Sequence, residues 1–412
     1  MKVFLYLGLY TTSILSAYGQ TGSDSSYEKI ISSYYEHYRN KEHFTAIQAA
    51  VFIPQSNNSS PAAIKTFAHG RVSDAHDAPP VDNQNLFEIG SITKSFTALL
   101  LLQLQVAGLL SLDDPLGKWL PQYSNWHAVT LRQLLNMTSG IPNYSEDPEF
   151  SKKMYANIGR VWSNQELLKY AHPERPLAKE RSNLYEYSNS NYILAALVIE
   201  KVAQKSFSQQ LKDKIINSTH GFTTTFYPVG DENPQEKEAI AARLVHGYYY
   251  DENTHKLHDT VQENLSWAAA AGGLVSTSAE VLHWVDLLYH GKLLPKAKQE
   301  QALTEMKTVV STNTGKAIKS VSAADPLGFG LGVVAFYDAT LKQKFWVYKG
   351  STLGFRVVYL WQPCNHIITV VSINSKGGEG NSQSTEGDES TKLSLDLYKN
   401  ILQQHPNLQC AL

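Results

Sequence analysis

The spacing of the hydrophobic residues changes twice along this chain of 412 residues, and that change limits the possible folds. From about residue 109 to 235, apolar residues recur every three or four positions, as in "SNYILAALVIEKVAQKS", which is typical of helices. Before and after this stretch, short runs rich in β-branched and aromatic residues predict strands. We therefore expect residues 20–108 and 236–412 to form an α/β lobe, and residues 109–235 a helical lobe of the same domain.

The predicted strands favour an antiparallel sheet flanked by helices, an α+β arrangement. The four late runs "GLGVVAFYD", "KFWVYKG", "GFRVVYLWQP" and "HIITVVSIN" are joined by short connections. Short connections suit antiparallel neighbours, because parallel strands need a long crossover. Two earlier strands are predicted in "TAIQAAVFIP" and "AAIKTFAHG", on either side of a polar turn.

The C-terminal segment bears on the two cysteines of the chain. "SKGGEGNSQSTEGDES" has the composition of a mobile, solvated loop, and "TKLSLDLYKNILQQ" predicts an amphipathic helix. A helix running back along the last strand would bring Cys410 close to Cys364. A disulfide and two unpaired thiols both remain open at this point.

The N-terminal residues differ from the rest of the chain. "MKVFLYLGLYTTSILSAYGQ" has one Lys, a short apolar region and then small residues at Ala17 and Gly19. This order predicts a signal peptide over residues 1–19, and the alternative is a buried N-terminal helix. Later apolar runs are interrupted before 18 residues. We expect a secreted or periplasmic protein without a transmembrane anchor after cleavage.

Composition and motifs exclude several function classes. The net charge is −2, and no basic cluster predicts a nucleic-acid partner. The sequence contains neither an HExxH motif nor a CxxC pair, so we expect no metal site. The glycines of "GFGLG" lack the strand–turn–helix setting of a dinucleotide site.

A serine and a lysine stand one turn apart at the start of the most hydrophobic predicted helix, in "FEIGSITKSFTALLLLQLQ". Ser91 and Lys94 would share one helix face. Burial among apolar residues lowers the pKa of an amine, and a neutral amine beside a hydroxyl can activate it as a nucleophile. The alternative is a helix cap at Ser91 with Lys94 reaching out to solvent.

Two further segments hold candidate site residues. The first is "YEYSNSNY", which contains Tyr187. A tyrosine near a lysine can titrate at lower pH than usual, so we predict that Tyr187 acts as a general acid and base. The Asn189 amide can orient a substrate carbonyl; otherwise it caps a helix. In "YKGSTLGF", Gly350 would let a substrate approach a strand edge, and the N–H of Ser351 could bind an oxyanion with that of Ser91. An ordinary hairpin is the alternative here.

Three motifs occur in this order along the chain: SxxK, YxN and a strand ending in GST. With these motifs in this order, the chain resembles the serine β-lactamase and penicillin-binding protein superfamily. It resembles most the branch of class C β-lactamases, D-alanyl-D-alanine carboxypeptidases and related esterases. The resemblance implies a helical lobe packed on an antiparallel α/β lobe, and an acyl-enzyme on Ser91. Lys94 and Tyr187 would move protons, and Asn189 would hold substrate. It implies a peptide, β-lactam or other small-molecule substrate and no cofactor.

The third motif departs from that family. The family has Lys or His two residues before the glycine, where this chain has Tyr348; Lys349 follows and would point to the opposite face. Losing that cation weakens recognition of a substrate carboxylate, unless Arg356 supplies the charge. A D-Ala-D-Ala-type peptidase or β-lactamase is the first hypothesis. A carboxylesterase is the second, and a non-catalytic penicillin-binding or sensor protein the third.

Overall fold

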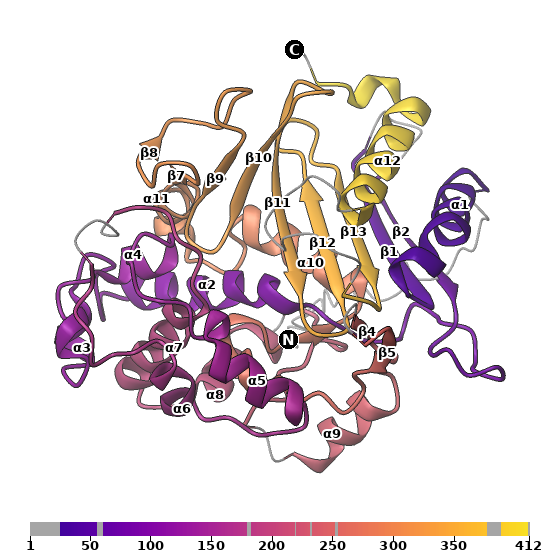
Figure 1. The fold of residues 1–412 in the computed structure, drawn as a ribbon. Helices are drawn as coiled ribbons and strands as arrows, with labels where there is room; N and C mark the ends of the chain where they lie inside the picture. Colours follow the sequence, from indigo (N-terminus) through magenta and orange to yellow (C-terminus); the bar gives the residue numbers. More distant parts are fainter. Residues whose placement is uncertain are drawn as a thin grey trace, which may run out of the picture.

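The computed structural model describes residues 25–55, 61–178, 183–218, 220–230, 233–251, 254–376 and 389–410. The predicted signal peptide and most of the predicted loop "SKGGEGNSQSTEGDES" lie outside these residues. Within them, nine strands form one sheet in the order β2-β1-β13-β12-β11-β10-β9-β7-β8, and each adjacent pair is antiparallel (Figure 1). These strands are β1 (Ala46–Ile53), β2 (Ala63–Gly70), β7 (Val309–Ser311), β8 (Ala317–Ile318), β9 (Leu327–Phe329), β10 (Val334–Asp338), β11 (Gln343–Ser351), β12 (Arg356–Trp361) and β13 (Ile368–Ile373).

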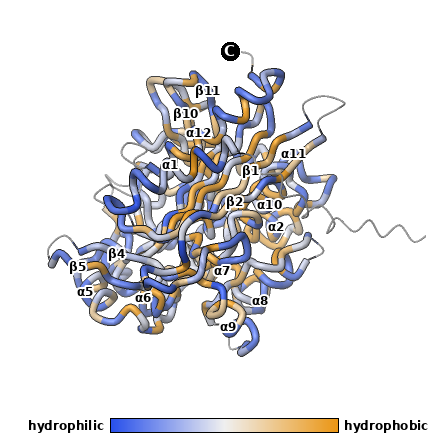
Figure 2. Tube along the Cα trace, turned by 90° about the vertical axis from the view of Figure 1, so that its right-hand side faces the viewer, coloured by the Kyte–Doolittle hydropathy of each residue, from blue (hydrophilic) through white to orange (hydrophobic). Residues whose placement is uncertain are grey.

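The sheet has a hydrophobic core on each face because successive side chains of a strand point to opposite sides. In β12, Val357 and Tyr359 pack into one core, and Val358 and Leu360 into the other. Helices α1 (Ser25–Glu42) and α12 (Glu389–Gln404) cover the second face, and α10 (Ser278–Tyr289) covers the first. Figure 2 shows the hydrophobic residues concentrated along the central strands.

Most of the other helices gather beside the first face of the sheet, in the lower half of Figure 1, whereas α11 lies at the level of the sheet, near β7. Among them α2 packs against α7, and both contribute to the larger core. They are α2 (Thr93–Val106), α3 (Leu116–Trp119), α4 (Leu131–Leu135), α5 (Pro148–Ala156), α6 (Asn164–Lys169), α7 (Asn189–Ala203), α8 (Phe207–Leu211), α9 (Pro234–Ala241) and α11 (Lys296–Met306). Two small two-stranded pairs, β3 (Phe87–Glu88) with β6 (Val275–Ser276) and β4 (Tyr248–Asp251) with β5 (Lys256–Asp259), complete the fold.

The predicted fold class, an antiparallel sheet with flanking helices, is confirmed. The N-terminal cap of α10 is Thr277, whose hydroxyl accepts a hydrogen bond from the Glu280 N–H. Cys364 and Cys410 form a disulfide with their Cα atoms 6.1 Å apart. Among the described residues, no helix is both long and apolar enough to cross a membrane.

Candidate active site

Ser91 lies in a tight turn between β3 and α2. The turn, Gly90–Ile92, is a single 3₁₀ turn, and α2 begins at Thr93. Gly90 adopts a φ of 49°, a left-handed conformation that favours glycine. We call this segment the Ser91 turn. It places the Ser91 side chain at the entrance of a buried helix, one turn before Lys94.

The structure brings Ser91, Lys94 and Tyr187 together. Lys94 Nζ lies 2.9 Å from Ser91 Oγ, and Tyr187 donates a hydrogen bond of 2.7 Å to the same oxygen. Lys94 Nζ also donates to the carbonyl oxygen of Ala271 at 2.7 Å. The Ser91 hydroxyl is therefore held between an amine and a phenol, and both are within reach for proton transfer.

The surroundings of Lys94 favour its neutral form. Its side chain is 0% exposed and lies over the rings of Tyr187 and Tyr192, with Nζ 4.8 Å and 5.6 Å from the ring centres. Burial lowers the pKa of Lys94 well below its ordinary value, because it removes solvation from the ammonium ion. This direction agrees with the expectation from the apolar helix.

Tyr187 differs from its prediction. We expected the nearby lysine to lower its pKa, but burial raises the pKa of Tyr187 to about 12, and hydrogen bonds with Ser91 and Tyr348 offset this only in part. The physical reason is that the phenol is largely buried, and burial disfavours the charged phenolate. Tyr187 is therefore a neutral phenol that can donate a proton at pH 7.

Asn189 lies at the first turn of α7 and borders the same pocket as Ser91. Its side-chain nitrogen donates to the Ser145 hydroxyl at 2.9 Å, and its backbone N–H donates to Asn143 Oδ1 at 3.0 Å. The capping residue of α7 is Ser188, so Asn189 does not act as the helix cap that the alternative proposed. Its amide is oriented by Ser145 and faces the pocket.

The third motif forms the end of β11. Tyr348 is 3% exposed, whereas Lys349 and Ser351 are partly exposed, and all three border the pocket. The register with β12 is regular, with Tyr348 opposite Tyr359 and Lys349 opposite Val358, so Lys349 does not occupy the face of Tyr348.

Gly350 makes room for the backbone of this protein. The prediction from the sequence is instead that the glycine makes room for a substrate. A Cβ atom at position 350 would lie 1.8 Å from the carbonyl oxygen of Ile89. A Cβ atom at Gly90 would lie 2.4 Å from the Ser351 nitrogen. The two glycines let the Ser91 turn and β11 touch backbone to backbone, and the peptide nitrogens of Ser91 and Ser351 both lie at this contact.

The end of β11 is paired with β12 on one side but extends past β10 on the other. Its ladder with β10 ends at Val347, while its ladder with β12 continues to Ser351. The backbone from Tyr348 to Ser351 therefore extends past β10 beside Ser91. Such an edge can pair with an extended substrate.

Arg356 does not supply the cation that Tyr348 lacks. Its guanidinium lies 2.5 Å from Glu42 Oε2, and it also donates to the Ser375 carbonyl oxygen at 3.0 Å. Both side chains of this ion pair are largely buried. The pair joins β12 to the end of α1, and Arg356 is not among the residues that line the pocket.

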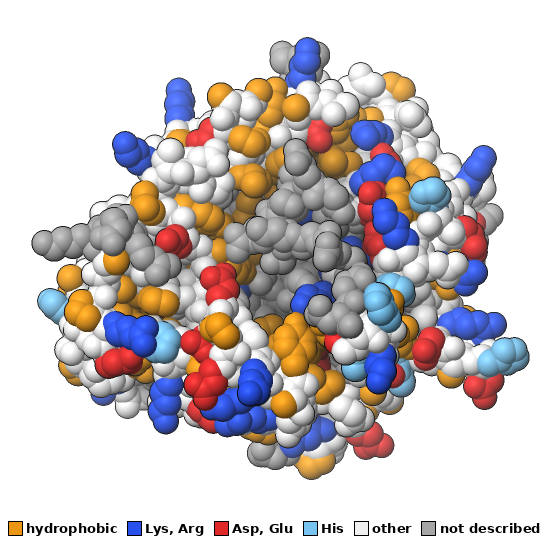
Figure 3. Space-filling view, viewed as in Figure 1, with side chains coloured by type: hydrophobic (Ala, Val, Ile, Leu, Met, Phe, Trp, Pro, Cys, Tyr) orange, Lys and Arg blue, Asp and Glu red, His pale blue; other side chains and the backbone are white. Residues whose placement is uncertain are grey.

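The pocket at Ser91 has a cavity volume of about 330 Å³ and one apolar wall. The aromatic rings of Tyr185, Tyr187 and Tyr348 pack around Phe329. In Figure 3 apolar side chains are most numerous in the upper left part of this side of the molecule, and charged side chains are scattered over the rest of it. The residues that line the pocket are Ser91, Tyr185, Tyr187, Asn189, Thr312, Leu327, Phe329, Val334, Val347, Tyr348, Lys349 and Ser351.

Sequence reasoning missed several of these groups. The carbonyl oxygen of Ala271 and the wall around Phe329 come from segments without a polar signal, so only the fold assigns them to the site. Tyr185 and Tyr192 belong to the segment "YEYSNSNY", and its density of aromatic residues is the sequence signal for this part of the site.

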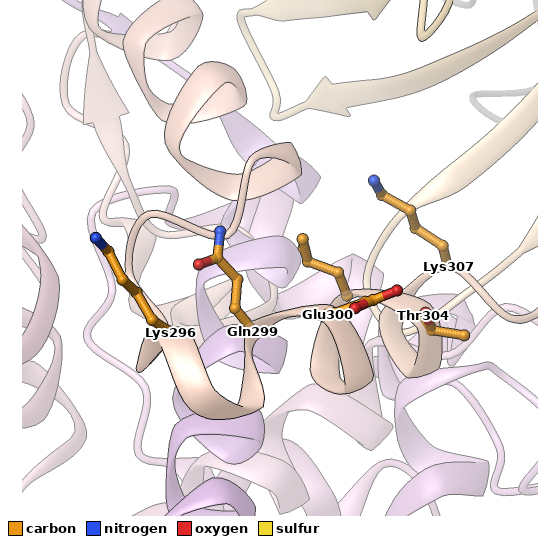
Figure 4. A pocket seen from close by; sticks show the side chains of 6 residues that line it. Lys296, Gln299, Glu300, Thr304 and Lys307 are labelled. Atoms are coloured by element: carbon orange, nitrogen blue, oxygen red, sulfur yellow. The ribbon is translucent and has the colours of Figure 1, made fainter.

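A second cavity lies along α11 and is lined mainly by polar side chains (Figure 4). It contains Lys296 and Lys307 but no serine or cysteine. Gln299 there donates to the backbone carbonyl of His290 and so supports the fold. In the part of the chain that the structure describes, no cluster of three His, Cys, Asp or Glu side chains could hold a metal ion.

Comparisons with known proteins match residues 62–389 to the family described as Beta-lactamase. Penicillin-binding protein 4* of Bacillus subtilis is 28% identical over 256 residues, covering 58% of this chain and 52% of that protein. Protein flp of Staphylococcus aureus is 26% identical over 238 residues, covering 56% and 43%. The chain thus spans about half the length of these curated relatives.

Solved structures extend the similarity to almost the whole fold. A D-stereospecific amidohydrolase from a Streptomyces species is 26% identical with a TM-score of 0.66, covering 84% of this chain and 95% of that one. The D-amino acid amidase of Ochrobactrum anthropi SV3 has the same fold, with 22% identity, a TM-score of 0.72 and coverage of 91% and 99%. Because the family match spans most of the sequence, the chain belongs to the β-lactamase family within the superfamily of serine hydrolases and penicillin-binding proteins.

Proposed function

We propose that this protein is a serine hydrolase that forms an acyl-enzyme on Ser91. The observation that carries the proposal is the position of Ser91 Oγ, 2.9 Å from Lys94 Nζ and 2.7 Å from the Tyr187 hydroxyl at the wall of a pocket. A hydroxyl held by a desolvated amine and a phenol is an activated nucleophile with its base and acid in place.

The reaction follows from these contacts. Neutral Lys94 takes the proton of Ser91 as Oγ bonds to the substrate carbonyl carbon, and the N–H groups of Ser91 and Ser351 stabilise the oxyanion. As the carbonyl carbon–nitrogen bond breaks, Tyr187 gives its proton to the leaving nitrogen and is reprotonated from Lys94. Water then attacks the acyl carbon and gives one proton to Lys94, which returns it to Ser91 as the carboxylic acid leaves.

The amide bond of a D-Ala-D-Ala-type peptide or of a β-lactam is the substrate that we favour. The similarity to a D-stereospecific amidohydrolase supports an amide with a D-configured residue. The wall of Leu327, Phe329 and Val347 supports a substrate with an apolar group next to the scissile bond, because burying that group on binding is favourable.

A carboxylesterase is the second candidate, and the third motif favours it. Tyr348 stands where the resembling enzymes have a cation, and Arg356 is engaged by Glu42. A neutral ester needs no partner for a carboxylate, so it would fit this pocket without the missing charge.

We further propose that the protein is exported. The pattern of residues 1–19 supports this, and so does the disulfide between Cys364 and Cys410, since disulfides persist mainly in oxidising compartments.

The test is to incubate the purified protein with a fluorescent penicillin, measure its intact mass, and assay D-alanyl-D-alanine peptides and p-nitrophenyl esters in parallel. We expect an adduct or turnover that S91A abolishes and that S33A, a change at an exposed serine of α1, leaves intact. Ester hydrolysis alone, lost in S91A, would favour the esterase. Equal activity of S91A and wild type would refute the acyl-enzyme, and inactivity of both would favour the non-catalytic alternative.

A further inference from the structure

Two carboxyl groups meet behind the Ser91 turn. Glu88 is the last residue of β3, three positions before Ser91, and is 1% exposed. Glu263 comes from the loop that precedes the short helix Leu265–Trp267. The two carboxyl groups lie against each other beside Thr352, and Glu88 Oε2 and Glu263 Oε2 are both buried without an ordinary hydrogen-bond donor. A hydrogen bond between two carboxyl groups requires a proton, because ionised carboxylates only accept.

Few other groups stabilise the two carboxyl groups, so the proton between them is their main source of stabilisation. Glu263 Oε1 accepts from Trp267 Nε1 at 2.6 Å, and the Leu353 N–H lies 3.5 Å away. Among the described residues, the buried atoms Glu88 Oε2, Glu263 Oε2 and Thr352 Oγ1 have no hydrogen-bond partner, so a proton held between the two carboxyl groups would satisfy an oxygen of each glutamate. Lys376, an exposed residue, contributes the positive charge that acts on Glu263.

The protonation behaviour agrees with this geometry. Burial, and then the charge of Glu263, raise the pKa of Glu88 well above its ordinary value. Burial raises the pKa of Glu263 to about 7. Two like charges this close in a buried site cannot both form at low cost.

The pair joins three segments of the candidate site. Glu88 leads directly into the Ser91 turn, and Thr352 and Leu353 follow Ser351 at the end of β11. Trp267 belongs to the segment that continues to Ala271, the acceptor of the Lys94 hydrogen bond. A displacement of either carboxyl group would therefore shift the two N–H groups that we assign to the oxyanion.

We propose that Glu88 and Glu263 share one proton at neutral pH, and that this proton fastens the Ser91 turn to the end of β11. Both glutamates are then positioning residues for acyl transfer at Ser91. The catalytic part rests on the proposed function, whereas the sharing of the proton does not.

The sign of the pH dependence follows from the raised pKa values. The folded chain binds more protons than the unfolded chain above the ordinary carboxyl pKa of about 4.5, so the stability due to the pair declines as pH rises through about 7 and beyond. When the last proton leaves, two buried charges repel each other. The distance between the Ser91 and Ser351 N–H groups then changes.

The direct test is infrared difference spectroscopy of wild type against E88Q at pH 7, which needs no substrate. We expect wild type to show the carbonyl stretch of a protonated carboxyl group and E88Q to lack it. The matched control is E280Q, because Glu280 is also buried but accepts from the N–H groups of Thr223 and Thr224. A wild-type spectrum without that stretch would overturn the shared proton.

The kinetic test compares pH profiles. The side-chain amide that E88Q introduces would donate to Glu263 at every pH, so the pH profile of kcat in E88Q should lack the alkaline decline that the pair causes in wild type. E88A should lower kcat by up to about 10²-fold, as removal of one oxyanion donor does. Identical alkaline limbs in wild type and E88Q would refute the positioning role. Failure of S91A to abolish turnover would instead refute the proposed function and leave the infrared result standing.

Discussion

At the scale of single residues, the proposed reaction depends on the neutral form of Lys94. Burial of the side chain favours that form more than the residues adjacent to Lys94 in sequence do. Ser91 and Lys94 were paired correctly in space from their spacing, because one helical turn brings them within 2.9 Å. The pKa of Tyr187 was predicted in the wrong direction, since its burial depends on Phe329 and Tyr348, which are remote in sequence.

Lys94→Arg tests the neutral amine. Because burial lowers the pKa of Lys94, wild-type acylation should increase as pH rises through that lowered pKa and lose rate below it. Arginine stays charged, so above that pKa K94R should acylate about 10²–10⁴-fold more slowly than wild type, and its rate should lack the rise with pH. Stopped-flow acylation with a chromogenic substrate across pH measures this.

The control for that experiment is the thermal unfolding of K94R, which shows whether the larger side chain is accommodated. A K94R protein that is folded and acylates at the wild-type rate would show that another group is the base.

Tyr348→Lys tests the missing cation. A lysine there would bind a substrate carboxylate, and a hydrogen bond to a charged group contributes about 1.5–3 kcal/mol. We expect kcat/KM for a carboxylate-bearing substrate to rise about tenfold or more relative to a neutral ester. The control Y348F should leave this ratio unchanged, and an unchanged ratio in Y348K would mean that carboxylate recognition lies elsewhere.

At the scale of elements, the site depends on how the Ser91 turn meets β11. Six strands of the large sheet, β1, β2 and β10 to β13, and the helices α2, α7 and α12 followed from hydrophobic periodicity, whereas β7, β8, β9 and α11 were not predicted. The contact between the turn and the strand did not, because Gly90 and Gly350 are far apart in sequence and a glycine carries no side-chain signal.

Gly90→Ala tests that contact. The Cβ atom would lie 2.4 Å from the Ser351 nitrogen, so the turn and β11 must separate. We expect a loss of about 1–3 kcal/mol in the free energy of unfolding from overpacking, together with a lower kcat. Urea unfolding and steady-state kinetics measure the two effects.

Gly108→Ala is the matched control, because Gly108 also has a positive φ but a Cβ atom there would meet nothing within 4 Å. G108A should lose stability through backbone strain without a change in kcat. An equal fall in kcat in both variants would contradict the role of the contact.

At the scale of the whole molecule, an ion pair and a disulfide connect the layer formed by α1 and α12 to the sheet. The ion pair of Arg356 and Glu42 joins β12 to α1, and the disulfide joins the turn after β12 to the segment after α12. Both lie on the side of the sheet opposite to Ser91, so they stabilise the fold without touching the pocket.

Removal of the disulfide in C364S/C410S tests this separation. The bridge closes 46 residues, which corresponds to about 4 kcal/mol of unfolding free energy in the chain-entropy model. We expect that loss in urea unfolding, with kcat/KM unchanged because the bridge is remote from Ser91. A large fall in kcat/KM of the folded variant would show coupling between the two sides of the sheet.

The sequence by itself determined the fold class, the central strands of the sheet and the Ser91–Lys94 pair, because hydrophobic period and helical spacing act over short distances along the chain. Only the tertiary structure decided what surrounds them: the pairing of Cys364 with Cys410, the raised pKa of Tyr187, the diversion of Arg356 to Glu42 and the meeting of Glu88 with Glu263. Each of these depends on burial or on contacts between segments distant in sequence, and neither is encoded by a local pattern.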